Sequence, residues 1–191
     1  MGQEIEAKVR ISDVAAVERA IADLGADYGG AWVEIDAFFD HPDRRLFEGD
    51  SALRLRVSQP LDETARRLQR AVLLTYKGPR EPGRLKVRPE HQVDIPDPAA
   101  MREILRGLNY SEAFSYEKRR RRWRFQGAEI TIDELPLLGF FVEVEAPNEA
   151  QVDQLLARLG LAASDVLTTS YVRLLRDRLG ESSDKALRFA D

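Results

Sequence analysis

Residues 3–11 read QEIEAKVRI, and this segment decides the fold because charged and apolar side chains alternate along it. Glu4, Glu6, Lys8 and Arg10 share one parity, and the apolar residues between them share the other. Successive side chains of a β-strand point to opposite faces, so the alternation predicts a strand with one charged and one apolar face. The fold therefore depends on where the charged face points.

The rest of the chain repeats this pattern between helical segments. Apolar residues at helical spacing predict helices over residues 13–24, 98–108, 149–159 and 170–179, and residues 60–69 form a polar insertion with a helical turn. Strand alternation is predicted over residues 31–40, 51–57, 71–77, 84–95, 114–125, 129–133 and 141–145.

Two arrangements explain strands whose polar faces are rich in Arg, Lys, Glu and Asp. An open antiparallel sheet would turn the charged face to water, which is the usual arrangement. A closed barrel would instead enclose the charged face and leave the apolar face to be covered by helices. Alternation alone favours the open sheet, so the choice depends on the motifs.

Composition narrows the possible functions. The 191 residues fit one domain, and 29 Lys and Arg against 33 Asp and Glu are more charges of both signs than solubility requires. The absence of cysteine excludes disulfides and thiolate chemistry, and only two histidines argue against a zinc site. No apolar run approaches the roughly 20 residues of a membrane helix, and no signal-peptide core is present. We expect a cytoplasmic protein with no membrane partner and, given the net charge of -4, no nucleic-acid partner.

The carboxylates of the first strand have a counterpart near the other end of the chain. Glu4 and Glu6 are two residues apart, as are Glu143 and Glu145, and Asp133 lies on the preceding strand. Residues two apart on a strand point the same way about 7 Å apart, and carboxylates this close repel one another unless a cation is nearby. Oxygen ligands of this kind suit Mg²⁺ or Mn²⁺, so these residues predict a metal site.

Cations provide the complementary feature on the same strand faces. A triphosphate carries about four negative charges, and Arg forks together with Lys point charges are the usual means of holding it. The cations of suitable parity are Lys8, Arg10, Arg54, Arg56, Lys77, Lys86, Arg88, Lys118, Arg120 and Arg122.

Seven short motifs, in order over about residues 3–176, resemble those of the CYTH superfamily, also called triphosphate tunnel metalloenzymes. They are Glu4-Ile5-Glu6-Ala7-Lys8 (ExExK), DAFFDHP at 36–42, ALRLR at 52–56, LTYKGP at 74–79, KRR at 118–120, Ile132-Asp133 with LGFFVEVE at 138–145, and SYVRLL at 170–175.

The resemblance implies an α+β fold: an eight-stranded antiparallel β-barrel, the triphosphate tunnel, with a polar interior and helices packed outside. Residues 1–179 would form this domain and residues 180–191 a polar tail. It also implies a Mg²⁺ or Mn²⁺ cofactor and overlapping sets of site residues. These are Glu4, Glu6, Glu143 and Glu145 for the metal, Lys8, Arg54, Arg56, Lys77, Lys86, Arg88, Lys118 and Arg120 for the substrate, and Lys8, Lys77 and Asp133 for catalysis.

Three functions remain open. The segments at 38–42 and 74–79, with the Arg88/Glu90 pair, favour the class IV adenylyl cyclase-like branch, which would convert ATP to 3′,5′-cyclic AMP and pyrophosphate. Pro89, between the members of that pair, departs from the pattern of this branch, because proline has no N–H to donate to the strand ladder. The alternative is a triphosphatase acting on tripolyphosphate, thiamine triphosphate or a nucleotide. A non-catalytic triphosphate sensor is the third, although the intact acidic residues weigh against it. The cyclase-like relatives also suggest a homodimer.

Overall fold

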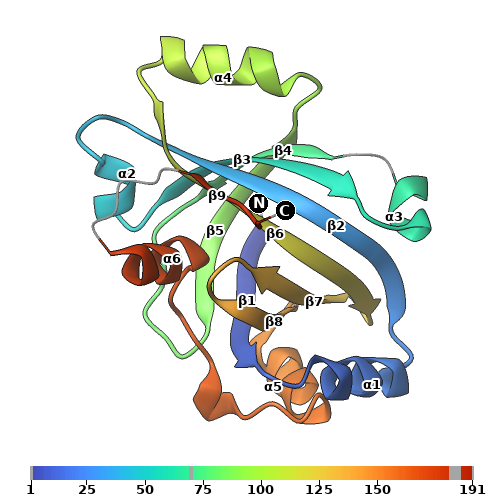
Figure 1. Cartoon of the computed structure of the whole chain (residues 1–191). Coiled ribbons are helices and arrows are strands. Elements are labelled where there is room, and N and C mark those ends of the chain that lie inside the picture. Colours follow the sequence, from blue (N-terminus) through green and yellow to red (C-terminus); the bar gives the residue numbers. More distant parts are fainter. Residues whose placement is uncertain (1, 69–70, 181–185, 191) are drawn as a thin grey trace.

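The computed structural model describes residues 2–68, 71–180 and 186–190, with only the backbone described for residues 2–4. Eight long strands form the centre, and the helices surround them (Figure 1). The strands are β1 (Gly2–Ile11), β2 (Asp27–Asp40), β3 (Ala52–Pro60), β4 (Val72–Lys77), β5 (Lys86–Asp94), β6 (Ser111–Phe125), β7 (Ala128–Leu135), β8 (Gly139–Glu145) and the short β9 (Ala186–Leu187). The helices are α1 (Val14–Leu24), α2 (Arg45–Glu48), α3 (Glu63–Arg67), α4 (Pro98–Gly107), α5 (Glu149–Arg158) and α6 (Tyr171–Leu179), with a 3₁₀ turn at Ala163–Asp165.

The sheet closes on itself. Its strand order is β2-β3-β4-β5-β1-β8-β7-β6, and β6 pairs again with β2, so eight strands form a closed barrel. All these pairings are antiparallel, and β9 adds a short parallel pairing on β6. The prediction of an eight-stranded antiparallel barrel is confirmed, and the open sheet is excluded. The strand at residues 186–187 lies in the segment that the sequence predicts as a tail.

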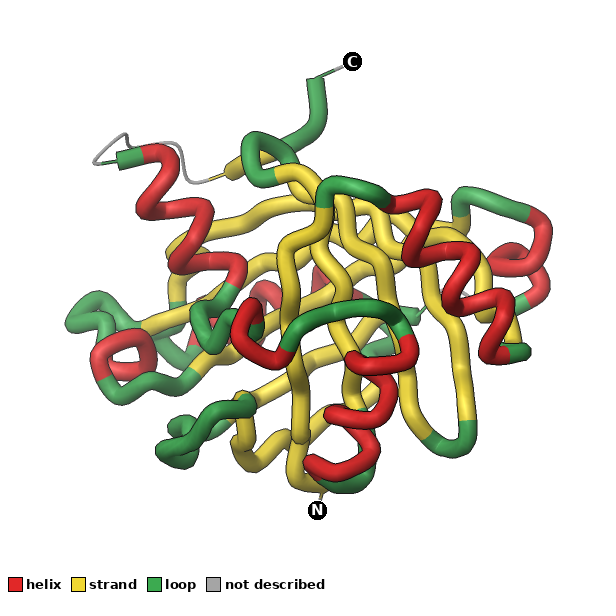
Figure 2. The backbone as a smooth tube through the Cα atoms, turned by 90° about the horizontal axis from the view of Figure 1, so that it is seen from below, coloured by secondary structure: helices red, strands yellow, loops and turns green. Residues whose placement is uncertain are grey.

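The outer faces of the strands carry the apolar residues. Helices lie over the outside of the barrel (Figure 2). Ile21 of α1 and Leu156 of α5 pack on Ala7, Ile130 and Val142 in one core cluster. Each of these helices begins at a side-chain cap: Asp13 accepts from the Ala16 N–H and Asn148 from the Gln151 N–H. The helices thus bury the apolar face of each strand that they cover, and the charged face points into the barrel.

Helix α6 has a different place, because it closes one end of the barrel interior. Tyr171 and Leu175 pack with Phe38, Phe114 and Phe141 in a second cluster. These three phenylalanines have the same parity on their strands as the charged interior residues, so they face inward. Aromatic side chains therefore line the cavity at the α6 end of the interior, whereas the other end carries Glu145 and its neighbours.

Strand boundaries differ from the sequence prediction by up to four residues, and two of these differences have a clear structural context. β2 begins at Asp27, four residues before the predicted start at 31, and its register with β6 shifts between Tyr28 and Ala31. Gly30 has φ +91°, and a Cβ there would lie 2.7 Å from the backbone nitrogen of Ala65, so the bulge lets α3 pack closely on β2. At the other boundary, β5 begins at Lys86, and Arg84 lies before the strand, ion-paired with Asp153 of α5.

Pro89 is accommodated at the end of one strand pairing. The β4–β5 ladder ends at Lys77 and Glu90, and the Gly78 N–H donates to the Pro89 carbonyl at 2.9 Å. A Cβ on Gly78 would lie 2.6 Å from Cγ of Pro89. The proline ring thus takes the space that a side chain at position 78 would need.

We expect Gly78→Ala to destabilise the barrel by about 1–3 kcal/mol, because the added methyl group overlaps the Pro89 ring. Urea unfolding would measure the loss. Gly107→Ala is the matched control, since nothing lies within 4 Å of a Cβ there and alanine favours the helix. Equal stability of the two variants would contradict the packing argument.

Candidate active site

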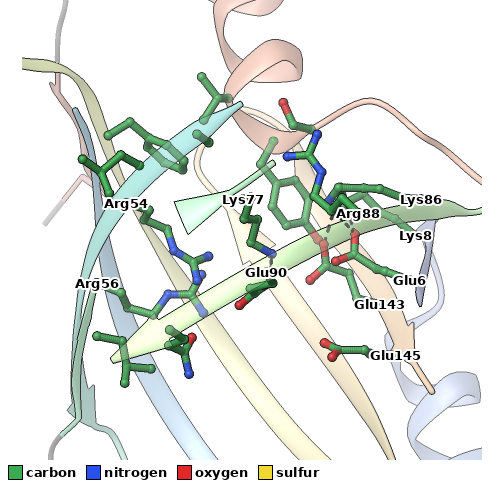
Figure 3. A pocket seen from close by; sticks show the side chains of 18 of the residues that line it. Glu6, Lys8, Arg54, Arg56, Lys77, Lys86, Arg88, Glu90, Glu143 and Glu145 are labelled. Carbon is green, nitrogen blue, oxygen red and sulfur yellow. Dashed lines mark hydrogen bonds and ion pairs between the residues drawn. The ribbon is translucent and has the colours of Figure 1, made fainter. Parts of the chain in front are cut away.

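The barrel encloses a cavity of about 880 Å³ that is lined by both signs of charge. Figure 3 shows Arg54 and Arg56 facing Lys8, Lys86 and their neighbours across this space. Every cation that the sequence predicts for substrate binding lines the cavity, namely Lys8, Arg54, Arg56, Lys77, Lys86, Arg88, Lys118 and Arg120. The structure thus gathers into one space residues that are spread over more than 100 positions of the sequence.

Predicted metal ligands meet at one side of the cavity. Glu6 lies directly opposite Glu145 in the β1–β8 ladder, and Lys8 lies opposite Glu143. The Lys8 ammonium is 3.4 Å from a Glu143 oxygen and 3.8 Å from a Glu6 oxygen. The side chain of Glu4, the fourth predicted ligand, lies outside the described residues.

Glu129 joins this acidic side, although sequence reasoning did not single it out. It pairs with Glu145 in the β7–β8 ladder and lines the cavity. The sequence could have indicated Glu129, because it lies an even number of residues from Asp133 on the same strand and therefore faces the same way. Carboxylates from three neighbouring strands therefore follow one another along the barrel wall, in the order Glu6, Glu145, Glu129.

Three other carboxylates lie behind the cations. Glu34, Asp36 and Asp133 are all 0% exposed, and none of them lines the cavity. Asp36 receives two hydrogen bonds from the Arg56 guanidinium, at 2.6 and 2.7 Å. Asp133 is bound in the same way by Arg120, at 2.6 and 2.5 Å, and by Lys118 at 3.1 Å. Asp133 thus supports cations, and its predicted catalytic role stays a prediction.

Glu34 is the shared partner of four cations. Its carboxylate is 2.9 Å from Arg56, 3.4 Å from Lys118 and 3.8 Å from Arg120, and it forms an ion pair with Arg122. The sequence contained a signal for this residue, because Glu34 has the parity of Asp36. However, the alternation of charged and apolar residues is less regular in that segment. The residues of β3 and β6 that contact Glu34 follow only from the closure of the barrel.

The charge compensation is visible in the pKa values of these groups. Burial alone would raise the pKa of Glu34, but the charges of Arg56, Lys118, Arg120 and Arg122 hold it well below its usual range. The same holds for Asp36: burial would raise its pKa, but the charges of Arg56 and Arg54 have the larger effect and lower it. Burial lowers the pKa of Lys118, as does the charge of Arg120, whereas Asp133 and Glu34 act against the shift. The acidic layer therefore helps to keep the cationic wall charged.

Lys8 is buried in a second arrangement. Its ammonium donates to the Thr169 carbonyl at 3.1 Å and lies 4.1 Å from the centre of the Tyr171 ring. Burial lowers the pKa of Lys8, and the charges of Glu143 and Glu6 oppose that shift. Tyr171 belongs to a motif noted in the sequence, but its place inside the barrel beside Lys8 followed only from the docking of α6.

Lys77, Arg88 and Arg54 complete the wall. The Lys77 ammonium is 2.8 Å from Glu90, its neighbour across the β4–β5 ladder. Arg88 contacts the carbonyl and the carboxylate of Asp50, and Arg54 donates to Thr75. These cations are thus held by local acceptors at the cavity surface.

The donor set suits a hard divalent cation. Among the residues that the structure describes, no three His, Asp or Glu side chains are grouped closely enough to hold a metal ion by themselves. Mg²⁺ needs no such cage, since one or two carboxylates together with substrate phosphates are its usual ligands. The opposed Glu6 and Glu145 provide that number, so the oxygen donors present fit Mg²⁺ or Mn²⁺.

Fold and cavity together define a class of protein: a closed antiparallel barrel whose interior carries a wall of buried cations facing an acidic side. The chain belongs to the CYTH domain family, which matches residues 2–171. The predicted family resemblance is thereby confirmed.

Relatives of known name agree with this assignment. A Methanocaldococcus jannaschii protein, named provisionally as an adenylate cyclase, is 30% identical over 180 residues, which are 90% of this chain and 97% of the relative. Adenylate cyclase CyaB of Aeromonas hydrophila is 30% identical over 192 residues, covering 95% and 93%.

Solved structures show the same fold. The PH1819 protein of Pyrococcus horikoshii has a TM-score of 0.78 at 26% identity, covering 91% of this chain and 98% of that one. A Hippeastrum protein, described as an adenylyl cyclase candidate that reveals a dominant triphosphatase activity, has a TM-score of 0.64 at 18% identity, covering 95% and 98%. Within the described part of this chain, no helix is long and apolar enough to cross a membrane. The cytoplasmic location, the homodimer and the lack of a nucleic-acid partner stay predictions.

We expect Glu34→Gln to lower the free energy of unfolding by about 3 kcal/mol, because three buried cations and the partly exposed Arg122 lose their shared counter-charge. Urea denaturation would measure the change. Glu63→Gln removes a carboxylate from an exposed i,i+3 ion pair with Arg66 and should leave stability unchanged within error. An unchanged midpoint in Glu34→Gln would show that Glu34 is not needed for charge compensation.

Stability should also fall in acid. Glu34 and Asp36 have ordinary pKa values of 4.5 and 3.8, and both are lower in the folded protein. The unfolded state therefore binds protons first, so this stabilisation is complete above about pH 4.5 and is lost as pH falls toward the folded values. Urea unfolding at pH values from about 6 to about 3 would show the decline, and Glu34→Gln should flatten it. A curve of the same slope in both proteins would contradict the assignment.

Proposed function

We propose that this protein is a divalent-metal-dependent enzyme that converts ATP to 3′,5′-cyclic AMP and pyrophosphate inside the barrel. The observation that carries the proposal is the cavity itself, which is lined by eight predicted substrate-binding cations and has two opposed carboxylates at one side. A nucleoside triphosphate needs both features, because its phosphates carry about four negative charges and travel with Mg²⁺. The adenylate cyclase name of a relative with 30% identity supports the reaction.

The substrate would be held mainly by guanidinium groups whose own positions are fixed from behind. Arg56 is bound by Asp36 and Arg120 by Asp133, so both guanidinium groups are ordered at the cavity wall before a ligand binds. Preorganised donors of this kind stabilise charge that develops in the transition state. They would stabilise the departing pyrophosphate.

Glu6 and Glu145, with Glu143 and the sequence-predicted Glu4, would hold the metal ion. A bound Mg²⁺ or Mn²⁺ supplies neutralisation of phosphate charge and a lower pKa for the attacking hydroxyl. In the reaction the ATP 3′-oxygen forms a bond to the α-phosphorus, the bond from that phosphorus to the bridging oxygen breaks, and the hydroxyl proton passes to water. Lys8 and Lys77, which line the cavity, would stabilise charge on the phosphate oxygens.

A triphosphatase is the second candidate, and a specific observation favours it. The Hippeastrum protein shares the fold and has a dominant triphosphatase activity. The same wall could hold a triphosphate while water attacks the terminal phosphorus, because both reactions require the same charge neutralisation. The products, rather than the binding residues, distinguish the two reactions.

The proposal is tested by incubating the protein with ATP and, separately, with tripolyphosphate, in the presence of Mg²⁺ or Mn²⁺. Chromatography and ³¹P NMR would resolve the products. Cyclic AMP with pyrophosphate supports the cyclase, and ADP with orthophosphate replaces it by the triphosphatase. Binding without turnover of either compound would favour a triphosphate sensor.

Glu6→Gln should abolish metal-dependent turnover, because it removes one of the opposed carboxylates while keeping the side-chain shape. Turnover assays with Mg²⁺ and Mn²⁺, together with circular dichroism, would measure activity and folding. Glu103→Gln is the matched control, since Glu103 is exposed on α4 and pairs with Arg106 outside the cavity. Retained activity in a folded Glu6→Gln variant would remove Glu6 from the metal site.

A further inference from the structure

One end of the cavity differs in chemistry from the cationic wall. There it is lined by Leu46 and Phe47 of the α2 turn, Leu53 of β3, Phe114 of β6, and the guanidinium groups of Arg44 and Arg176. A bare tripolyphosphate is charged along its whole length and gains nothing from aliphatic and aromatic walls. The composition of this end therefore indicates a substrate with an organic part.

Arginine and phenylalanine side chains are layered at this end. The guanidinium carbons of Arg44 and Arg176 lie 4.8 and 5.3 Å from the centre of the Phe47 ring. Arg176 also lies 5.5 Å from the Phe114 ring, so it joins α2 to β6. Guanidinium planes and aromatic rings are the two kinds of surface on which planar bases stack.

Asp40 fixes the position of this layer. Its carboxylate accepts hydrogen bonds from the backbone N–H groups of His41, Leu46 and Phe47, at 2.7, 3.1 and 2.9 Å. The turn that carries Phe47 is thereby held in place before any ligand binds. Asp40 is 6% exposed, so its charge is used within the fold.

The net charge of this end is positive. In the described part of the chain, neither Arg44 nor Arg176 forms an ion pair with a carboxylate, and the nearby Arg173 pairs only with Asp177 at 3.7 Å. A ligand ring that carries a positive charge, such as the thiazolium of thiamine triphosphate, would be repelled here. A neutral base with acceptor atoms on its edge would instead receive hydrogen bonds from arginine donors.

We propose that the α2–α6 end of the cavity is a subsite for a neutral planar base, so that the substrate is a nucleoside triphosphate rather than tripolyphosphate or thiamine triphosphate. This inference rests on the proposed function only in that the cationic wall holds the triphosphate. It does not depend on whether the reaction is cyclisation or hydrolysis.

The test compares the binding of ATP and tripolyphosphate by titration calorimetry in EDTA, where turnover cannot interfere. Phe47→Ala should weaken ATP binding roughly tenfold, because stacking is lost, and should leave tripolyphosphate binding unchanged. Arg176→Gln should act in the same direction. Arg158→Gln is the matched control, since Arg158 also stacks on a phenylalanine, Phe125, but does not line the cavity.

Tripolyphosphate binding also reports an intact barrel. Equal weakening of both ligands by Arg176→Gln would mean that this end binds phosphate charge, and would overturn the proposal. The same conclusion follows if neither variant changes ATP binding. If Phe47→Ala fails to fold, Arg176→Gln decides by the same comparison.

Thiamine triphosphate tests the charge argument. The wild-type protein should bind it more weakly than ATP, and the double variant Arg44→Gln/Arg176→Gln should narrow the difference. Tighter binding of thiamine triphosphate by the wild type would overturn the assignment to a neutral base.

Production of orthophosphate instead of cyclic AMP would refute only the cyclase, whereas a failure of both ATP and tripolyphosphate to bind would refute the proposed function and this subsite together.

Discussion

Buried charge compensation is the constraint on which this structure depends. Glu34, Asp36 and Asp133 lie fully buried beneath the cations of the cavity wall. Cations brought together inside a barrel would repel one another and lose protons unless carboxylates lay close to them. The barrel can therefore keep a positive interior because it also buries a layer of negative charge.

This arrangement divides the interior carboxylates into two kinds. Those behind the cations are saturated by guanidinium and ammonium groups, as Asp36 is by the fork of Arg56. Those that line the cavity, such as Glu145, lie where a ligand can reach them. Carboxylates thus hold the cations in position behind the wall and form a binding surface at the cavity. Their burial, and not their pattern in the sequence, distinguishes the two roles.

The barrel also explains why the ends of the cavity differ. Strand parity sends Phe38 and Phe114 into the same interior as Arg56, and α6 packs Tyr171 against them. The interior is consequently charged along the wall and carries aromatic side chains toward α6. This gradient is the physical basis for expecting a substrate with a charged part and an organic part.

Much of this was predictable from the sequence because strand parity is a local property. The alternation in residues 3–11 and its repetition identified the inward face of almost every strand. The helices that the sequence predicts are present, whereas the short α2 was not predicted. The signal was weakest in β2, where Gly29 and Gly30 interrupt the alternation and the strand begins four residues early. Motif order was needed to choose a closed barrel over an open sheet, since alternation is the same in both.

The sequence by itself determined which face of most strands points inward, most of the cations that line the cavity and the family to which the chain belongs. It did not predict that Arg44 and Arg176 line the cavity, and Arg10, which has the inward parity, does not line it. Only the tertiary structure decided which inward residues touch. Glu34 meets Arg122 across 88 positions, and Lys8 meets Thr169 across 161. Such contacts arise from closing β2 onto β6 and docking α6, and no periodic pattern encodes their distances. Parity is set by the backbone of one strand, whereas a partner is set by the packing of all eight.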